Sequence, residues 1–201
     1  MEAVANALNL DFDFFEAISK DDYKTLNEYE SDLAPPQKAC YVSHYKVWQL
    51  VAQRNSSALI LEDDVDFEMN ISSVMLEILR ILPADWEMLY LGHCSQEDFG
   101  EPLGESSGFK LFKSTRPSCT HAYAVSSSGA AKLLELLVNP KMPVDVELVF
   151  NIEPGKIISY SIEPPLIAQW KSPDNPSDIS PGAMDEMQHL QNSTLHYLGL
   201  S

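Results

Sequence analysis

Hydrophobic residues follow two kinds of spacing along this chain, and each kind predicts a different element. Apolar residues that recur three or four positions apart predict helices over residues 3–8, 35–55, 71–82, 127–138 and 144–152. Short apolar or alternating runs predict strands over residues 11–14, 58–61, 87–91, 121–125 and 157–162. Strands and helices that alternate in units of roughly thirty residues indicate an α/β sandwich with a mainly parallel sheet.

The strand predicted at 58–61 leads into an acidic run. Because this strand is a short apolar run bounded by polar residues, we expect it to be a central strand covered on both faces. The next residues are Glu62-Asp63-Asp64-Val65-Asp66, so four carboxylates fall within five positions. In open α/β sheets, ligands bind at the carboxyl ends of the strands. This position is the first indication of a functional site.

So many neighbouring carboxylates are unfavourable unless they are solvated or bind a cation. Oxygen ligands suit Mg²⁺ or Mn²⁺, which can bridge two carboxylates and a diphosphate. Such a metal would act as a Lewis acid and stabilise a departing nucleoside diphosphate. The alternative interpretation is an acidic turn that only caps the next helix.

Three stretches without a clear period are predicted to lie outside these elements. Residues 21–32 are polar and predict a loop, and residues 92–108 predict a long one. Beyond Lys171, the Pro, Ser, Asp and Asn content is typical of a mobile tail. The sequence therefore predicts one domain over residues 1–170 and a C-terminal tail over 171–201.

The charge of the chain limits its partners. Its 201 residues include 30 acidic and 13 basic residues, a formal net charge of −17. Without a cluster of basic residues, this charge repels nucleic acid, so we expect no such partner. No apolar stretch is long enough to span a membrane, and the acidic surface disfavours docking on anionic lipid. A metal could supply the positive charge that a phosphorylated ligand requires.

The compartment is not determined by the sequence. The first ten residues contain neither the positive charge nor the apolar run of a signal peptide or anchor, so the chain as written is expected in the cytoplasm. Sequons at Asn55, Asn70 and Asn192 would suit the lumen of the endoplasmic reticulum or Golgi if the N-terminus is truncated, although so short a pattern often arises by chance.

Three cysteines do not indicate a disulfide framework. Cys40, Cys94 and Cys119 are too few and too widely spaced for a zinc knuckle, and their number is odd. We therefore expect buried free thiols.

Three further segments, taken with the acidic run, resemble a known family. They are Cys40-Tyr41-Val42-Ser43-His44 with Trp48, Thr120-His121-Ala122-Tyr123 with Gly129-Ala130, and Pro143-Val144-Asp145. Together with residues 58–65 (ALILEDDV) they resemble glycosyltransferase family 25, the lipooligosaccharide and procollagen galactosyltransferase group. The resemblance covers residues 10–169, and ALILEDDV with the upstream Ser-His is its most specific part.

The resemblance implies a GT-A fold and an inverting hexosyltransferase. The donor would be a UDP-sugar, with galactose as the expected hexose, and the acceptor a hydroxyl of a glycan or glycoprotein. Mn²⁺ is the expected cofactor, with Mg²⁺ as the alternative, and Asp63 and Asp64 correspond to the metal-binding pair of the family. The resemblance also implies a donor site, for which the candidates are Ser43, His44, Glu62, Thr120 and His121.

Inversion in a single displacement needs a carboxylate that takes the proton of the acceptor hydroxyl. Asp145, in the Pro-Val-Asp segment, is our first candidate for this base and Glu147 the second. A purely local role as helix N-cap is the alternative for Asp145. For His44, which lies on a helix with an apolar face, the alternative is a hydrogen-bonded packing residue.

The chain also departs from the family pattern. The usual opening strand, of the form INLxRxxxR, is absent, and glycines expected near positions 39 and 119 are Ala39 and Cys119. We expect a free sheet edge as a result. A catalytically silent relative that acts as a binding module is therefore the competing interpretation. A metal-dependent hydrolase ranks last, because the clustered histidines of such sites are missing.

Overall fold

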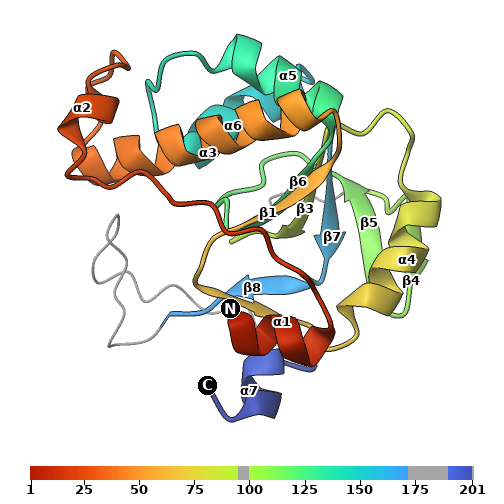
Figure 1. The fold of residues 1–201 in the computed structure, drawn as a ribbon. Coiled ribbons are helices and arrows are strands. Elements are labelled where there is room, and N and C mark those ends of the chain that lie inside the picture. Colours follow the sequence, from red (N-terminus) through yellow and green to blue (C-terminus); the bar gives the residue numbers. More distant parts are fainter. Residues whose placement is uncertain (95–99, 172–189, 201) are drawn as a thin grey trace.

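A computed structural model describes residues 1–94, 100–171 and 190–200 of the chain (Figure 1). Its main sheet has six strands in the order β1-β6-β3-β7-β5-β4. In chain order these are β1 (Ala58–Leu61), β3 (Met88–Gly92), β4 (Gly104–Ser106), β5 (Phe109–Lys113), β6 (Ala122–Val125) and β7 (Ser159–Glu163). A smaller sheet pairs β2 (Val65–Phe67) with β8 (Ile167–Gln169). Together with the helices described next, these sheets confirm the predicted α/β class.

Three helices pack on one face of the main sheet (Figure 1). They are α3 (Pro35–Arg54), α5 (Ser127–Leu136) and α6 (Val144–Ile152). Their side chains Trp48, Leu133 and Leu148 join a buried cluster with Tyr90 of β3 and Tyr123 of β6. This face of the main sheet therefore carries a buried cluster of aromatic side chains.

The other face is covered by α4 (Ile71–Ile81) and by the small sheet, with α1 (Glu2–Leu8) and α7 (Thr194–Leu198) beyond it (Figure 1). Phe67, Ile78 and Leu89 belong to the buried cluster on this side. A short helix, α2 (Tyr23–Leu26), packs beside α3 through Leu26. Hydrophobic burial on both faces thus fixes the main sheet between two layers.

A glycine sets the close approach of α5 to the sheet. The side chain of Ser126 caps the helix by accepting the Gly129 N–H at 3.0 Å. A Cβ atom at Gly129 would lie 2.3 Å from the carbonyl oxygen of Glu87, just before β3. Only glycine fits here without a shift of the backbone. The Gly-Ala pair noted in the sequence thus has a packing role.

The prediction of a mainly parallel sheet is wrong. Among the described strands of the main sheet, only β3 and β7 pair in parallel. β1, β3 and β7 run in the same direction, as the helix–strand alternation suggests, but β6 lies between β1 and β3 and runs antiparallel to both. The period of a strand contains no information on which neighbour it pairs with, so the inserted strand could not be seen in the sequence.

The prediction of a central position for residues 58–61 is also wrong. β1 is an edge strand that pairs only with β6 within the main sheet. Its residues are only partly covered, and Leu59 is 40% exposed. A continuous apolar run was read as burial on both faces, whereas only Ile60 of this strand is buried. β1 thus forms one edge of the main sheet, and β4 forms the other.

Several shorter predictions need correction as well. Residues 11–14 form no strand, although Phe12 stacks on Phe67 with ring centroids 6.1 Å apart. The predicted loop at 21–32 contains α2, and the predicted loop at 92–108 contains β4, while residues 95–99 of it lie outside the described residues. No helix within the described part of the chain is long and apolar enough to cross a membrane.

The predicted C-terminal tail is partly packed on the domain. Residues 190–200 include α7, whose Thr194 hydroxyl donates to the Phe67 carbonyl of β2 at 2.7 Å. Residues 172–189 and 201 lie outside the described residues. The polar composition of residues 171–201 suggested a mobile segment because it contains few apolar residues, but the carboxylates of Asp66 and Glu68 accept backbone N–H groups of Gln191, Asn192 and Leu195.

Candidate functional site

The candidate metal-binding carboxylates follow the last residue of β1. Asp63 is exposed, whereas Asp64 is partly buried beside β8. The Oδ2 atom of Asp64 accepts a hydrogen bond from Nε2 of Gln169 at 2.7 Å, and its carbonyl oxygen accepts the Trp170 N–H at 2.6 Å. The other carboxylate oxygen, Oδ1, is buried and has no hydrogen-bond partner among the described residues. One carboxylate oxygen at this strand end is therefore free to bind a ligand.

The electrostatic environment of Asp64 favours a positive ligand. Burial, and after it the negative charge of Glu62, raises the pKa of Asp64 from 3.8 to about 6. Asp63 adds to this effect, and the hydrogen bond from Gln169 opposes it. A carboxylate with a raised pKa beside two other carboxylates gains from any cation that neutralises them. The residues present thus fit an oxygen-binding divalent ion such as Mn²⁺ or Mg²⁺.

Glu62 faces a different environment, because its carboxylate already has partners. Its Oε1 atom accepts the hydroxyl of Thr120 at 2.8 Å and lies 3.5 Å from Nε2 of His44. Nδ1 of His44 is 2.9 Å from the Tyr123 hydroxyl, which accepts Nε1–H of Trp48 at 2.8 Å. We call Trp48, Tyr123, His44, Glu62 and Thr120 the Glu62 network.

The Glu62 network holds an ion pair between buried His44 and half-buried Glu62. Burial alone lowers the pKa of His44, but Tyr123, Cys40 and Glu62 outweigh it and raise that pKa well above 6.5. Burial alone raises the pKa of Glu62, but the hydrogen bond and charge of His44, with Thr120, lower it below 4.5. The two shifts agree, because each charged form stabilises the other.

The other predicted donor residues occupy different surroundings. Ser43 donates to the Ala39 carbonyl and accepts the Ile18 N–H, both at 2.8 Å, so its hydroxyl fixes the N-terminal segment on α3. His121 is buried, and Nε2 lies 3.4 Å from the Ile167 carbonyl oxygen. Burial lowers the pKa of His121, although the charge of Glu62 opposes this. The structure therefore brings His44, Glu62 and Thr120 into direct contact, and leaves Ser43 outside that group.

Both candidate bases lie in the first turn of α6. Asp145 contacts the segment before β6, since its Oδ2 atom accepts the Cys119 N–H at 3.4 Å. Oδ1 of Asp145 accepts the Val146 N–H at 2.9 Å, and the N-cap position belongs to Pro143. Glu147 is buried, and its Oε1 accepts the N–H groups of Lys141 and Met142 at 3.2 and 3.3 Å. The contacts of Glu147 support the loop before α6, whereas Asp145 joins α6 to the candidate site.

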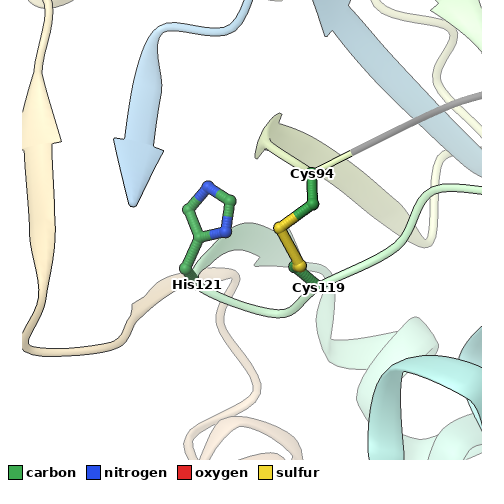
Figure 2. A group of neighbouring side chains, drawn as sticks. All are labelled: Cys94, Cys119 and His121. Carbon is green, nitrogen blue, oxygen red and sulfur yellow. A yellow bond between two sulfur atoms is a disulfide. The ribbon is translucent and has the colours of Figure 1, made fainter. Parts of the chain in front are cut away.

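The prediction that all three cysteines are free thiols is wrong. Cys94 and Cys119 form a disulfide, and Cys40 is free (Figure 2). Cys94 follows β3 by two residues and Cys119 precedes β6 by three, and these strands pair antiparallel with Gly92 opposite Ala122. The pairing of β3 with β6 therefore brings together sulfurs that are 25 residues apart in the sequence. A count of cysteines cannot show such a pairing.

Two glycine-related positions shape this region. A Cβ atom at Gly92 would lie 2.1 Å from the Ile167 carbonyl oxygen and 2.4 Å from Nε2 of His121, so only glycine fits here. Cys119 stands where the family pattern has a glycine, and its φ of 66° is the left-handed conformation that glycine favours. The backbone before Thr120 and His121 thus keeps the left-handed conformation that a glycine would favour, although the residue here is a cysteine.

Sequence reasoning missed two residues of the site. Tyr123 lies within the Thr-His-Ala-Tyr segment, yet only the structure shows its hydroxyl between His44 and Trp48. Gln169 had no assigned role, and its amide binds Asp64. The β2–β8 pairing, which is not visible in the sequence, places Gln169 opposite Val65 and so next to Asp64.

The α/β fold, with paired and unpaired carboxylates after β1, is compatible with a glycosyltransferase, and the family comparison places the chain in that class. A family model described as glycosyltransferase family 25 (LPS biosynthesis protein) matches residues 1–148. The chain belongs to glycosyltransferase family 25.

Similar proteins include members named as galactosyltransferases and members named as inactive. Procollagen galactosyltransferase 1-B of Xenopus laevis is 33% identical over 131 residues, which are 62% of this chain and 21% of that protein. Procollagen galactosyltransferase 1-A of the same species is 29% identical over 149 residues, 65% of this chain and 24% of that protein. The probable inactive glycosyltransferase 25 family member 3 of Bos taurus is 29% identical over 137 residues, which are 62% of this chain and 22% of that protein. The chain thus spans about a quarter or less of the length of these relatives.

Proposed function

We propose that this chain is a hexosyltransferase domain that transfers galactose from UDP-galactose to a hydroxyl of a glycan or glycoprotein, with inversion at the anomeric carbon. Family membership and the galactosyltransferase names of its relatives support the class of reaction. The single observation that carries the proposal is the free Oδ1 atom of Asp64, buried at the end of β1 among neighbouring carboxylates.

Asp64 and the exposed Asp63 would hold the divalent metal. Gln169 fixes one oxygen of Asp64 and so orients the other, which is how outer residues orient a metal ligand. The bound metal would supply Lewis-acid stabilisation of the departing diphosphate. Glu62 contributes negative charge, and its Oε1 atom is already bound by Thr120 and lies beside His44.

Asp145 is proposed to take the proton of the acceptor hydroxyl. It lies at the first turn of α6, where the N-terminal end of the helix stabilises its negative charge. The Cys119 N–H joins it to the segment that carries Thr120 and His121, so donor and base residues share one rigid connection. Glu147, whose Oε1 accepts two backbone N–H groups, ranks behind Asp145 for this role.

The competing function is a catalytically silent binding module. Two observations favour it: relatives named as inactive match with similar identity, and β1 is a free edge of the sheet. In that case the fold and the Glu62 network persist, while turnover is absent. Both functions are compatible with the same fold, but only the first requires the chain to transfer galactose.

Calorimetry with UDP and UDP-galactose, with and without Mn²⁺, tests the metal site. We expect Mn²⁺ to enhance UDP binding and Asp64→Asn to remove that enhancement, a loss of at least about tenfold in affinity. Asp13→Asn is the matched control, because it removes the same charge from an exposed carboxylate paired only with Arg54. UDP binding that does not depend on the metal and is equal in the wild type, Asp64→Asn and Asp13→Asn would exclude the proposed metal site.

Transfer from UDP-galactose to procollagen, the acceptor that the names of the relatives give, tests the base. Asp145→Asn keeps the hydrogen-bonding shape of the side chain, so we expect UDP affinity to persist while transfer falls by about 10²–10⁴-fold. Glu147→Gln, which can still accept the two backbone N–H groups, is the control and should retain transfer. If metal-dependent UDP binding is present but the wild-type chain transfers nothing, the silent module is the better interpretation.

A further inference from the structure

We propose that Cys94, Cys119 and His121 form a zinc site when the disulfide is reduced. This redox-dependent site is separate from the carboxylates of Asp63 and Asp64. It uses sulfur and nitrogen ligands, whereas the proposed metal site at Asp63 and Asp64 uses oxygen ligands, although His121 is also one of the donor-site candidates. Its existence does not depend on glycosyl transfer.

The three side chains already lie together (Figure 2). A sulfur of each cysteine and a ring nitrogen of His121 all lie within 4.8 Å of one another. Cys94 follows β3, and both Cys119 and His121 precede β6, so the paired strands hold the ligands from two sides. The Cα atoms of the two cysteines are 5.6 Å apart. Two thiolates in a tetrahedral zinc site lie about 3.8 Å apart, which rotation about the Cα–Cβ bonds can provide once the covalent bond is broken.

His121 offers the nitrogen that a metal requires. Its Nε2 atom faces the Ile167 carbonyl oxygen at 3.4 Å, and a hydrogen bond there leaves the lone pair on Nδ1. Nδ1 is buried and has no hydrogen-bond partner among the described residues. In Figure 2 one ring nitrogen points toward the disulfide. A buried nitrogen without a partner is costly, and a metal on the sulfur side would satisfy it.

The close approach of Gly92 keeps the imidazole in this position. A Cβ atom at Gly92 would lie 2.4 Å from Nε2 of His121, so the glycine leaves just enough space for the ring. The ring is thus held close to the sulfurs by packing, before any metal binds.

The chemistry of the switch is balanced as follows. A phosphine reductant supplies two electrons and takes the oxygen of one water molecule to become a phosphine oxide, the Cys94–Cys119 bond breaks, and the two protons of that water complete two thiols. Zn²⁺ then binds both sulfurs and Nδ1, and the two thiol protons are released to solvent. Two thiolates and an imidazole select zinc over the hard ions Mn²⁺ and Mg²⁺. Three protein ligands leave the fourth position open.

The test compares oxidised and reduced protein in zinc binding, with zinc alone as the probe. Native mass spectrometry gives the stoichiometry, and competition with a chromophoric chelator gives the affinity after reduction by a phosphine. We expect one zinc ion bound to the reduced chain with affinity at least tenfold higher than that of the oxidised chain. Co²⁺ substitution should show sulfur-to-metal charge-transfer absorption in the reduced chain alone.

Three variants decide which residues are the ligands. Cys119→Gly removes one sulfur, and glycine suits the φ of 66°, so the fold should persist while reduced-state zinc binding is lost. His121→Asn should weaken binding at least tenfold. Cys40→Ala is the matched control, because it removes the remaining thiol of the chain and should leave binding intact.

Several results would overturn the proposal. Equal zinc binding in both redox states would assign the ion to carboxylates, and loss of binding in Cys40→Ala would assign it to Cys40, His44 and Glu62, which also lie within 4.8 Å of one another. Binding that survives in Cys119→Gly would exclude the two-sulfur site. Circular dichroism checks the fold after reduction, and unfolding at that step would equally contradict a site preformed by β3 and β6.

Discussion

The acidic run after β1 divides into two regions with opposite surroundings. In the first region, Glu62–Asp64, Asp63 is exposed and Asp64 keeps a buried oxygen without a partner among the described residues. In the second region, Asp66–Glu68, the carboxylates are buried and bind backbone N–H groups of residues 191–195. Adjacent residues of the same chemical type therefore serve different purposes.

The difference follows from what each carboxylate faces. Asp66 accepts the N–H groups of Phe67 and Leu195 and the hydroxyl of Ser193, so it joins β2 to α7. Glu68 accepts the N–H groups of Gln191 and Asn192. These bonds compensate the cost of burying charge. The carboxylates of the second region are structural, so the proposed cation site involves only those of the first region.

The largest effect on stability should come from the second region. Asp66→Ala removes the acceptor of two backbone N–H groups and one hydroxyl, and leaves buried donors without partners. We expect a loss of about 3 kcal/mol in the free energy of unfolding, measured by urea denaturation. Asp13→Ala, on the surface, is the control and should change stability by less than about 0.5 kcal/mol. An equal effect of both substitutions would show that Asp66 does not hold α7.

A smaller loss is expected from Glu62, which belongs to the first region yet resembles the second. Glu62→Gln removes the counter-ion of buried His44 but can still accept the Thr120 hydroxyl. Removing one partner of a buried ion pair is destabilising, and because one bond is retained we expect a loss of about 2 kcal/mol, again by urea denaturation.

The pH dependence of this loss identifies the ion pair. The lowered pKa of Glu62 gives stability that is present above its unfolded value of 4.5 and lost as pH falls through the folded value. The raised pKa of His44 gives stability that is present below its unfolded value of 6.5 and lost as pH rises through the folded value. The penalty of Glu62→Gln should therefore be largest between pH 4.5 and 6.5. A penalty that does not vary with pH would argue for a neutral hydrogen bond.

The sequence predicted the elements well because periodicity is a local property. The helices at 35–55, 71–82, 127–138 and 144–152 and the strands at 58–61, 87–91, 121–125 and 157–162 correspond to α3, α4, α5, α6, β1, β3, β6 and β7 within a few residues. Strand pairing is not local, so the insertion of β6 beside β1 was missed, and with it the antiparallel sheet. The Cys94–Cys119 disulfide was missed for the same reason.

The position of the acidic run at a strand end was predicted, but the contacts of its members were not. Local sequence placed Glu62, Asp63 and Asp64 at a strand end, and the structure agrees. The contacts that distinguish them come from distant residues: Gln169 for Asp64, and His44 and Thr120 for Glu62. Asp66 was counted as the fourth carboxylate of the acidic run, although it binds residues 193–195. Charge density in a sequence can thus locate a site, but only pairing shows which charges remain available.

The smallest effect has the opposite sign and tests the first region directly. The folded pKa of Asp64, about 6, exceeds the unfolded value of 3.8, so the folded state binds more protons between these values and stability falls as pH rises through that window. In the presence of a chelator at pH 7, Asp64→Asn should therefore increase the free energy of unfolding, by on the order of 1 kcal/mol once solvent screening of this partly exposed group is included. The increase should vanish below pH 3.8. Mn²⁺ should stabilise only the wild type and so make it more stable than Asp64→Asn. Urea denaturation from pH 3.5 to 7.5 measures both; a variant less stable than the wild type in chelator would show that Asp64 is a structural carboxylate like Asp66.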